Sequence, residues 1–340
     1  PIVSLRKAAL DGAILNHRND KNPLMHSELC RQKLETLSGE SRLAYLKQCY
    51  ETFSGMDCGS SFVADYANSL GGYEDYSEES VEGDDLTRQN EIRRRQLVIC
   101  RDYVEAHPQA KNIGYVRSVI CDLESKRISL NFPDQSLPGR QIKVKVSGAN
   151  VYAPYILAVP CVAPDYRRGV RFSKLRAVPK AAASLRVDLA GNTPDESKTE
   201  VEFPALPPGC YALIASSSES PADIYGDKDD MASLILVSDL TAFITGRGDE
   251  RVLHVSSGSN LAPVEGAKVT FTDRRDSRKE MVKHVTTGKD GEARIPFSSA
   301  RYSIKKNGQI FFGDSYSYGS SGSEADKTVY AAQVLTDLSV

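Results

Sequence analysis

The residues from 231 to 255 constrain the fold of this 340-residue chain more than any other segment. Residues 234–237 form a short apolar run, and two further runs follow at 240–245 and 252–255 with almost no spacer. Short apolar or alternating runs bounded by turn residues are typical of β-strands. The segment therefore predicts that one β-domain ends near residue 240, and that a second begins directly after it. We expect the two to keep a fixed relative orientation, because flexible linkers need Gly, Ser or Pro residues.

Hydrophobic residues alternate with a period of two from about residue 126 onward. Turn-rich pieces such as Pro138-Gly139 and Pro207-Pro208-Gly209 separate these runs. About seven short strands over such a length are typical of a β-sandwich, so residues 126–240 are predicted to form one. The predicted strands contain Ile128, Leu130 and Phe132, then Ile142, Val144 and Val146, and then the runs 155–159, 185–189, 199–203, 211–215 and 234–237.

Residues 241–340 repeat this pattern and are predicted to form a second sandwich. Asn307-Gly308 stands between two short runs and predicts a two-residue type I′ hairpin. Asp290-Gly291 predicts another turn, and residues 329–338 resemble a closing strand.

The first 125 residues show the spacing of helices instead. Apolar residues recur every three or four positions, and one such stripe stops at His107-Pro108, because proline disfavours helix in the residue before it. Short helices joined by short turns pack antiparallel. The predicted fold is therefore α+β and multidomain: a helical bundle over residues 1–125, followed by immunoglobulin-like sandwiches over 126–240 and 241–340.

The composition limits the classes of partner that the protein can bind. The net charge of -2 gives no field that would attract nucleic acid, and no apolar run reaches the roughly 18 residues that a membrane helix needs. The seven cysteines lack zinc-binding spacing, so we expect most of them to be buried free thiols, with a Cys49–Cys58 disulfide as an alternative.

The sequence contains no catalytic motif that we recognise. It has no G-x-S-x-G elbow, no P-loop and no H-E-x-x-H, and its five histidines are scattered. We therefore predict no catalytic residues, no cofactor and no metal ligands, and interpret the protein as a non-enzyme.

Several motifs, in order along the chain, resemble bacterial α2-macroglobulin-like proteins. Residues 203–213, with Pro207-Pro208-Gly209 before Tyr211, look like the strand–turn–strand of a macroglobulin domain. Leu236-Val-Ser-Asp-Leu240 resembles the junction between consecutive macroglobulin domains. Residues 263–269 together with 289–293 resemble the family's "P-x-x-GA-x-V … DG-x-A" pattern. The helical residues 104–123 are similar to the leader found in large Bacteroidetes members.

This resemblance implies two macroglobulin-type sandwiches within a large envelope protein that traps proteases after they cut a bait segment. Many members carry a thioester formed by a C-x-E-Q motif, and none of the seven cysteines stands in one. We therefore expect a non-catalytic N-terminal scaffold segment, whose leader or anchor lies outside this chain. Its partners would be the other domains of the same protein and, through that protein, target proteases. The alternative is a surface adhesin, or a glycan- or protein-binding module, built of tandem sandwiches.

Two surface segments are candidates for interaction. Arg167, Arg168 and Arg171 stand in a basic run over residues 165–176 that also contains Tyr166 and Phe172, and we interpret it as a surface strand with one basic face or a contact to another domain. A nucleic-acid site is not favoured, because the rest of the chain is acidic and no recognition fold accompanies the run. Tyr316 and Tyr318 lie among Gly and Ser and suit protein or glycan recognition, with an ordinary edge strand as the alternative.

The acidic residues 71–85 contain seven carboxylates and no basic residue. We expect a solvated loop, because such charge cannot be buried without partners; a calcium site is the alternative. Limited proteolysis should therefore cleave first within this stretch. Resistance that disappears on adding EDTA would contradict the solvated loop and favour calcium.

Overall fold

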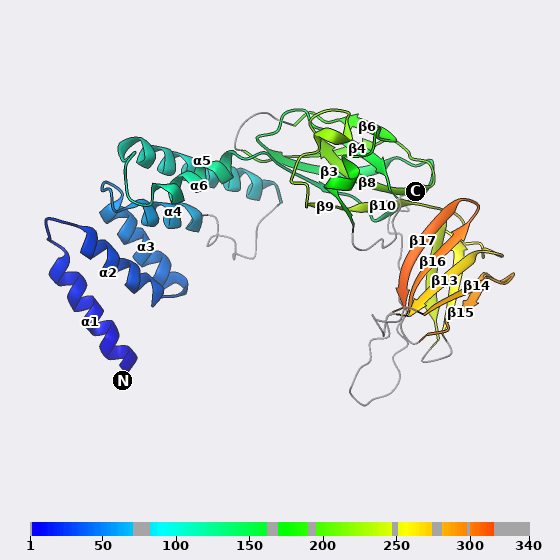
Figure 1. Ribbon diagram of the computed structural model, residues 1–340, viewed down its shortest axis with the longest axis horizontal. Coiled ribbons are helices and arrows are strands. Elements are labelled where there is room, and N and C mark those ends of the chain that lie inside the picture. Colours follow the sequence, from blue (N-terminus) through cyan, green and yellow to red (C-terminus); the bar gives the residue numbers. More distant parts are fainter. Residues whose placement is uncertain are drawn as a thin grey trace. The chain divides into compact units, whose positions relative to one another are not determined.

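The computed structural model describes residues 2–70, 82–161, 169–189, 195–246, 251–273, 281–297 and 300–315. Helices come first and strands follow, as Figure 1 shows. The chain divides into two compact units. The first is Pro1–Arg127 with two short additions, Gly148–Val151 and Ala190–Ser197, and the second holds the remaining residues. The predicted α+β, multidomain fold, with a helical bundle before two β-sandwiches, is confirmed.

Six helices occupy the described part of the bundle: α1 (Ile2–His17), α2 (Leu24–Glu35), α3 (Gly39–Phe53), α4 (Ser60–Ser69), α5 (Glu82–Ala106) and α6 (Ile113–Glu124). Two apolar clusters hold them together. One joins α2, α3 and α4 through stacked rings, with the Phe53 and Phe62 centroids 5.1 Å apart. The other joins α4, α5 and α6 around Cys100 and Val116, both fully buried. Helix α5 ends just before His107-Pro108, as the sequence predicts.

The first sandwich consists of a three-stranded and a five-stranded sheet. The smaller sheet has the order β1-β3-β7 and the larger one β2-β10-β8-β4-β6. Ile142, Val144 and Val146 of β3 face Ile156 and the fully buried Phe203 in the core between them. The strands are β1 (Arg127–Asn131), β2 (Gln135–Ser136), β3 (Ile142–Ala149), β4 (Tyr155–Pro160), β6 (Ala183–Arg186), β7 (Ser197–Phe203), β8 (Gly209–Ser216) and β10 (Leu234–Val237).

The five-stranded sheet is covered on both faces, which the sequence analysis did not predict. Ile156, Leu157, Ala158 and Val159 of β4 are all fully buried, so side chains on both faces of the strand are excluded from water. A third layer covers the second face with Leu175, Ile224 and other apolar residues. It is built from β5 (Val170–Arg171), α7 (Phe172–Leu175), the short 3₁₀ helix η2 (Pro221–Asp223) and β9 (Met231–Ala232). Uninterrupted apolar runs are the signature of a strand buried on both faces.

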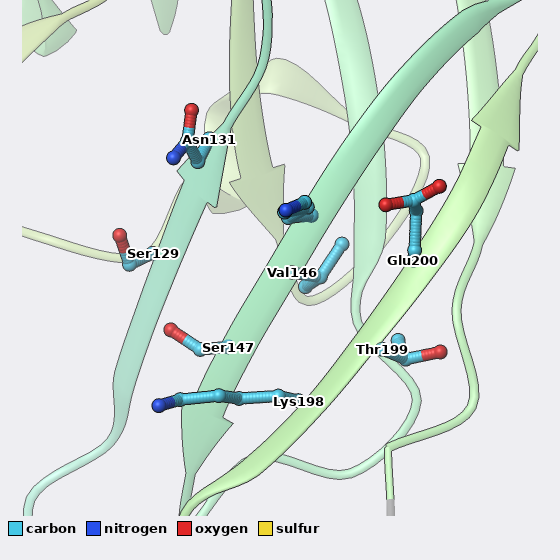
Figure 2. A pocket seen from close by; sticks show the side chains of 8 residues that line it. Ser129, Asn131, Val146, Ser147, Lys198, Thr199 and Glu200 are labelled. Carbon is cyan, nitrogen blue, oxygen red and sulfur yellow. The ribbon is translucent and has the colours of Figure 1, made fainter. Parts of the chain in front are cut away.

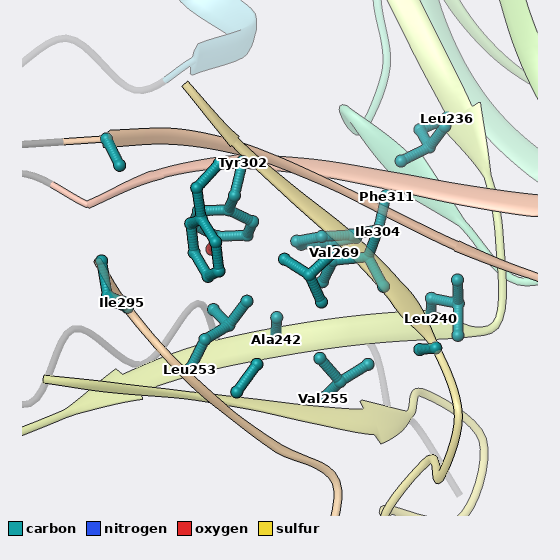
Figure 3. Close-up of a cluster of buried hydrophobic side chains, with 14 residues drawn as sticks. Leu236, Leu240, Ala242, Leu253, Val255, Val269, Ile295, Tyr302, Ile304 and Phe311 are labelled. Carbon is teal, nitrogen blue, oxygen red and sulfur yellow. The ribbon is translucent and has the colours of Figure 1, made fainter. Parts of the chain in front are cut away.

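The second sandwich follows without a connecting domain. Its sheets have the orders β11-β12-β15 and β14-β13-β16-β17, and Figure 3 shows the core between them. Asn307 and Gly308 have φ of 50° and 78° and join β16 to β17 as the predicted hairpin. Residues 329–338 lie outside the described part of the chain. The strands are β11 (Leu240–Thr245), β12 (Val252–Ser257), β13 (Lys268–Asp273), β14 (Val282–Thr286), β15 (Glu292–Arg294), β16 (Ala300–Lys306) and β17 (Gln309–Ser315).

The third layer yields a prediction about stability. Leu157 points into that layer and is fully buried, so Leu157→Ala should lower the free energy of unfolding by about 3 kcal/mol. Leu15, which is 67% exposed, is the matched control, because Leu15→Ala should change the free energy of unfolding by less than about 0.5 kcal/mol. Denaturant unfolding measures both. Equal effects would show that the third layer does not pack on the sheet.

Candidate functional site: the junction between the two sandwiches

Only Ser238 and Asp239 separate the last strand of the first sandwich, β10, from the first strand of the second, β11. Ser238 is completely buried, and Val237 and Leu240 beside it are 1% and 4% exposed. A buried backbone must find hydrogen-bond partners within the protein, because each unpaired group costs free energy. The partners come from both sandwiches, and this segment is the junction sequence identified above.

The first sandwich holds the junction through β2. This short strand pairs in parallel with β10, and the backbone N–H of Ser238 donates to the carbonyl of Ser136 at 3.0 Å. The side chain of Gln135 reaches further along: its Nε2 donates to the carbonyls of Ser238 at 3.2 Å and Leu240 at 2.8 Å. One amide therefore spans the last residues of one domain and the first residue of the next strand.

The second sandwich holds the same residues through β17. Gln309 Oε1 accepts hydrogen bonds from the backbone N–H of Asp239 at 2.6 Å and from the hydroxyl of Ser238 at 3.4 Å. Gln309 follows the Asn307-Gly308 turn directly, so the hairpin sets its position. The Ser238 hydroxyl also accepts from the backbone N–H of Leu240 at 3.1 Å, which closes a tight turn.

The carboxylate of Asp239 ties the junction to the end of β12. Its Oδ2 accepts from the Ser257 hydroxyl and its Oδ1 from the Ser259 backbone N–H, each at 2.8 Å. The backbone carbonyl of Asp239 accepts from Gly258 N–H at 2.5 Å. Both the backbone and the side chain of Asp239 are therefore committed to the second sandwich.

Apolar contacts also connect the two sandwiches at the junction. Leu236 belongs to β10 of the first sandwich, yet it packs in the cluster that forms the second core. Figure 3 shows it at one end of that cluster. Cys210 of β8 contacts this cluster too, and also the third layer of the first sandwich. The junction therefore combines buried hydrogen bonds with continuous apolar packing.

The basic run singled out in the sequence forms a different structure from the one predicted. Within the described part of the run, from residue 169 onward, Val170 and Arg171 are in strand conformation and α7 begins at Phe172, so the interpretation as a surface strand is wrong beyond Arg171. The reason is that Phe172 and Leu175, three positions apart, both pack into the third layer. Arg171 stays exposed, 3.7 Å from Asp229.

The structure does not describe the remaining predicted interaction residues. Arg167, Arg168, Tyr316 and Tyr318 lie outside the described residues, as do residues 71–81 of the acidic stretch. Arg176, at the end of the same basic run, donates to the carbonyls of Ile224 and Gly226 and so holds the third layer in place.

One shallow depression of about 450 Å³ lies on the outer face of the β1-β3-β7 sheet. Figure 2 shows Ser129 and Asn131 of β1 beside Ser147 of β3, with Lys198 and Glu200 on β7. Its charges are of both signs and it contains no aromatic ring, so we interpret it as the solvated face of the sheet. Within the described ranges, no three His, Cys, Asp or Glu side chains gather as a metal site, and no helix is long and apolar enough to cross a membrane.

Comparison with known proteins finds similarity only among solved structures. No family model matches the chain. No curated protein matches it. The native α2-macroglobulin of Escherichia coli spanning domains MG0-NIE-MG1 is similar at 17% identity and a TM-score of 0.37, over 55% of this chain and 64% of that one. Its NIE-MG1 fragment gives 17% identity and 0.38, over 55% of this chain and 97% of the fragment. A mutant Salmonella α2-macroglobulin gives 15% and 0.32, over 55% of this chain and 12% of that one.

The hydrogen bonds of the junction lead to a test by substitution. Gln309→Ala would leave the N–H of Asp239 without its acceptor and should lower the free energy of unfolding by about 1–2 kcal/mol. Asp239→Ala should cost about 1.5–3 kcal/mol, because two hydrogen bonds to a charged group are lost. Gln141 is exposed and serves as the control, since Gln141→Ala should change stability by less than about 0.5 kcal/mol. If all three variants unfolded alike, the two side chains would not be holding the junction.

Proposed function

We propose that this chain is a non-catalytic shell segment of a large α2-macroglobulin-like protease-trapping protein of the bacterial envelope, of the type present in Bacteroidetes. The observation that carries the proposal is the junction. The sequence that resembles the link between macroglobulin domains, Leu236-Val-Ser-Asp-Leu240, passes from one sandwich to the next through two residues, of which Ser238 is completely buried and Asp239 half-buried.

The other motifs that resemble the family, at 203–213 and at 263–269 with 289–293, also have identifiable structural roles. The hydroxyl of Tyr211 donates to the carbonyl of Pro207 at 3.0 Å, which braces the Pro-Pro-Gly turn before β8. Phe203, at the start of that motif, is fully buried in the first core. Phe203, Pro207 and Tyr211 therefore belong to one strand–turn–strand unit.

In the second sandwich, hydrogen bonds connect residues 263–269, the first half of the paired motif, to Thr287, which precedes the second half at 289–293. Ala267 N–H donates to the Thr287 hydroxyl at 2.8 Å, and that hydroxyl donates to the carbonyl of Val264 at 2.6 Å. Gly291 has φ of 75°, and a Cβ there would lie 2.4 Å from the carbonyl oxygen of Val255. Glycine is required at this position because the backbones approach too closely for a side chain.

A shell segment contributes to trapping through the positions in which it holds its domains, and not through catalysis. In the proposed mechanism, proteolysis of a bait segment elsewhere in the parent protein releases a rearrangement of its domains around the protease. Two domains joined by a short, hydrogen-bonded passage move together as a rigid body, whereas domains joined by a flexible linker would move independently. The partners of this segment are the other domains of the parent protein, and target proteases meet it only through that protein.

The proposal is tested by comparing the isolated chain with its full-length parent. The chain alone should neither hydrolyse casein nor reduce its digestion by trypsin, even in tenfold molar excess. The parent should reduce digestion of casein while trypsin still cleaves a small chromogenic peptide, because a trapped protease keeps its active site. Stoichiometric inhibition by the chain alone would contradict the shell role. A parent with no effect on casein digestion, carrying stalk repeats instead of a bait segment, would support the adhesin.

A further inference from the structure

Two cysteines that are 49 positions apart in the sequence lie against each other in the first sandwich. Cys161 directly follows β4, and Cys210 is the second residue of β8. Their Sγ atoms are 3.6 Å apart, and the backbone N–H of Cys161 donates to the carbonyl of Cys210 at 3.0 Å. The β4–β8 pairing, which includes Pro160 opposite Tyr211, therefore continues by one more pair.

Cysteines at such positions satisfy the geometry of a disulfide. Residues directly opposite on antiparallel strands have Cα atoms about 4.5–5.5 Å apart, and disulfides join Cα atoms about 4.4–6.8 Å apart. Bringing the sulfurs from 3.6 Å to bonding distance requires side-chain rotation without displacement of either strand. Both thiols are half-buried at the end of the ladder, so an oxidant can reach them.

We propose that Cys161 and Cys210 are a redox modification site, and that they form an intramolecular disulfide when the protein meets a disulfide-bearing oxidant. The oxidant is either a protein dithiol oxidase or a low-molecular-weight disulfide such as oxidised glutathione. This inference rests on strand geometry and is independent of the proposed function.

The reaction is a thiol–disulfide exchange in two steps. The Cys161 thiol loses its proton, and the thiolate attacks one sulfur of the oxidant, forming a mixed disulfide and releasing the oxidant's other sulfur as a thiolate. The Cys210 thiolate then attacks Cys161 Sγ, which forms the protein disulfide and releases the second oxidant thiolate. Two electrons and two protons pass from the protein to the oxidant and its solvent. The hydrogen bond between the thiols lowers the pKa of Cys161 and raises that of Cys210, which favours attack in this order.

The other cysteines provide internal controls. Cys30 and Cys49 also interact, but they are 4% and 3% exposed within the helical bundle, where an oxidant cannot reach them without local unfolding. Cys121 is exposed on α6 and is a separate, accessible thiol. Selective pairing of Cys161 with Cys210 therefore distinguishes strand geometry from accessibility alone.

The position of the pair gives the disulfide a structural effect. Cys210 contacts both the third layer of the first sandwich and the cluster of the second core. A bond from Cys210 to Cys161 would close a loop that contains α7, β6 and β7, and would fix the end of β4 beside the junction. Disulfides that close loops of this length restrict the unfolded chain strongly.

Peptide mapping under native conditions tests the proposal. The folded chain is treated with oxidised glutathione, remaining thiols are alkylated, and trypsin digestion follows without reduction. Cleavage after Lys and Arg gives the peptides 146–167 and 199–228, each with a single cysteine. We expect these two to be recovered joined, with a mass two hydrogens below their sum, and to separate on reduction. Two of the seven thiols should be lost from the native count.

Cysteine variants and thermal unfolding provide two further tests of the proposal. Cys161→Ala and Cys210→Ala should each abolish the joined peptide, whereas Cys121→Ala should leave it unchanged. The wild-type Tm should rise by about 5 °C or more on oxidation and return on reduction, with no rise in either variant of the pair. The proposal would be overturned if both peptides were alkylated separately in the wild type, if only a glutathione adduct remained on Cys161, or if only Cys30 and Cys49 were joined.

Discussion

The hydrogen bonds of the buried Ser238 and the half-buried Asp239 determine how the two sandwiches can be joined. Because Ser238 is completely buried, its backbone must be satisfied within the protein, and Ser136 and Gln135 of the first sandwich accept from its N–H and donate to its carbonyl. Gln309 of the second sandwich accepts from the Ser238 hydroxyl and from the backbone N–H of Asp239. Neither amide can be removed without leaving a buried polar group unpaired, which costs more than the hydrogen bond contributes when formed. The passage between the domains is therefore part of both folds.

The rest of the first sandwich supports this junction. Strand β10 lies between β2 and β8 in the five-stranded sheet, and the third layer covers the face of that sheet that a two-layer sandwich would leave to solvent. A strand buried on both faces has little freedom to shift register, because a shift by one residue would exchange the side chains of the two faces. Leu236 extends from this fixed strand into the second core. The second sandwich thus begins on a strand that the first has already positioned.

The sequence predicted the features that depend on neighbouring residues. The helical spacing before Pro108, the period-two runs after residue 126 and the Asn307-Gly308 turn were all read locally and correspond to elements of the structure. The apolar run 155–159 also carried the signal of a strand buried on both faces, but the segments that cover it, 169–175 and 221–232, have no apolar periodicity of their own. Their role depends on the sheet they cover.

Features that depend on distant residues could not be predicted. Gln135 and Gln309 lie about 100 and 70 residues from the junction they bind, and nothing in their local sequence distinguishes them from other glutamines. Cys30, Cys49 and Cys100 are buried, but Cys58, Cys161 and Cys210 are half-buried and Cys121 is exposed, so the prediction that most of the seven are buried is wrong. Cys49 is hydrogen-bonded to Cys30, and the alternative Cys49–Cys58 disulfide is not formed. The pairing of strands β4 and β8 had to be known before Cys161 and Cys210 could be placed together.

We expect the two sandwiches to keep one relative orientation. Small-angle scattering in solution tests it when the chain is compared with a variant that carries six Gly and Ser residues inserted after Asp239. Both chains carry the same helical domain, so the difference between them reports on the junction. We expect a narrower distribution of interatomic distances and a smaller maximum dimension for the uninserted chain. Two indistinguishable, equally broad distributions would show that the junction is already flexible, and would contradict the account.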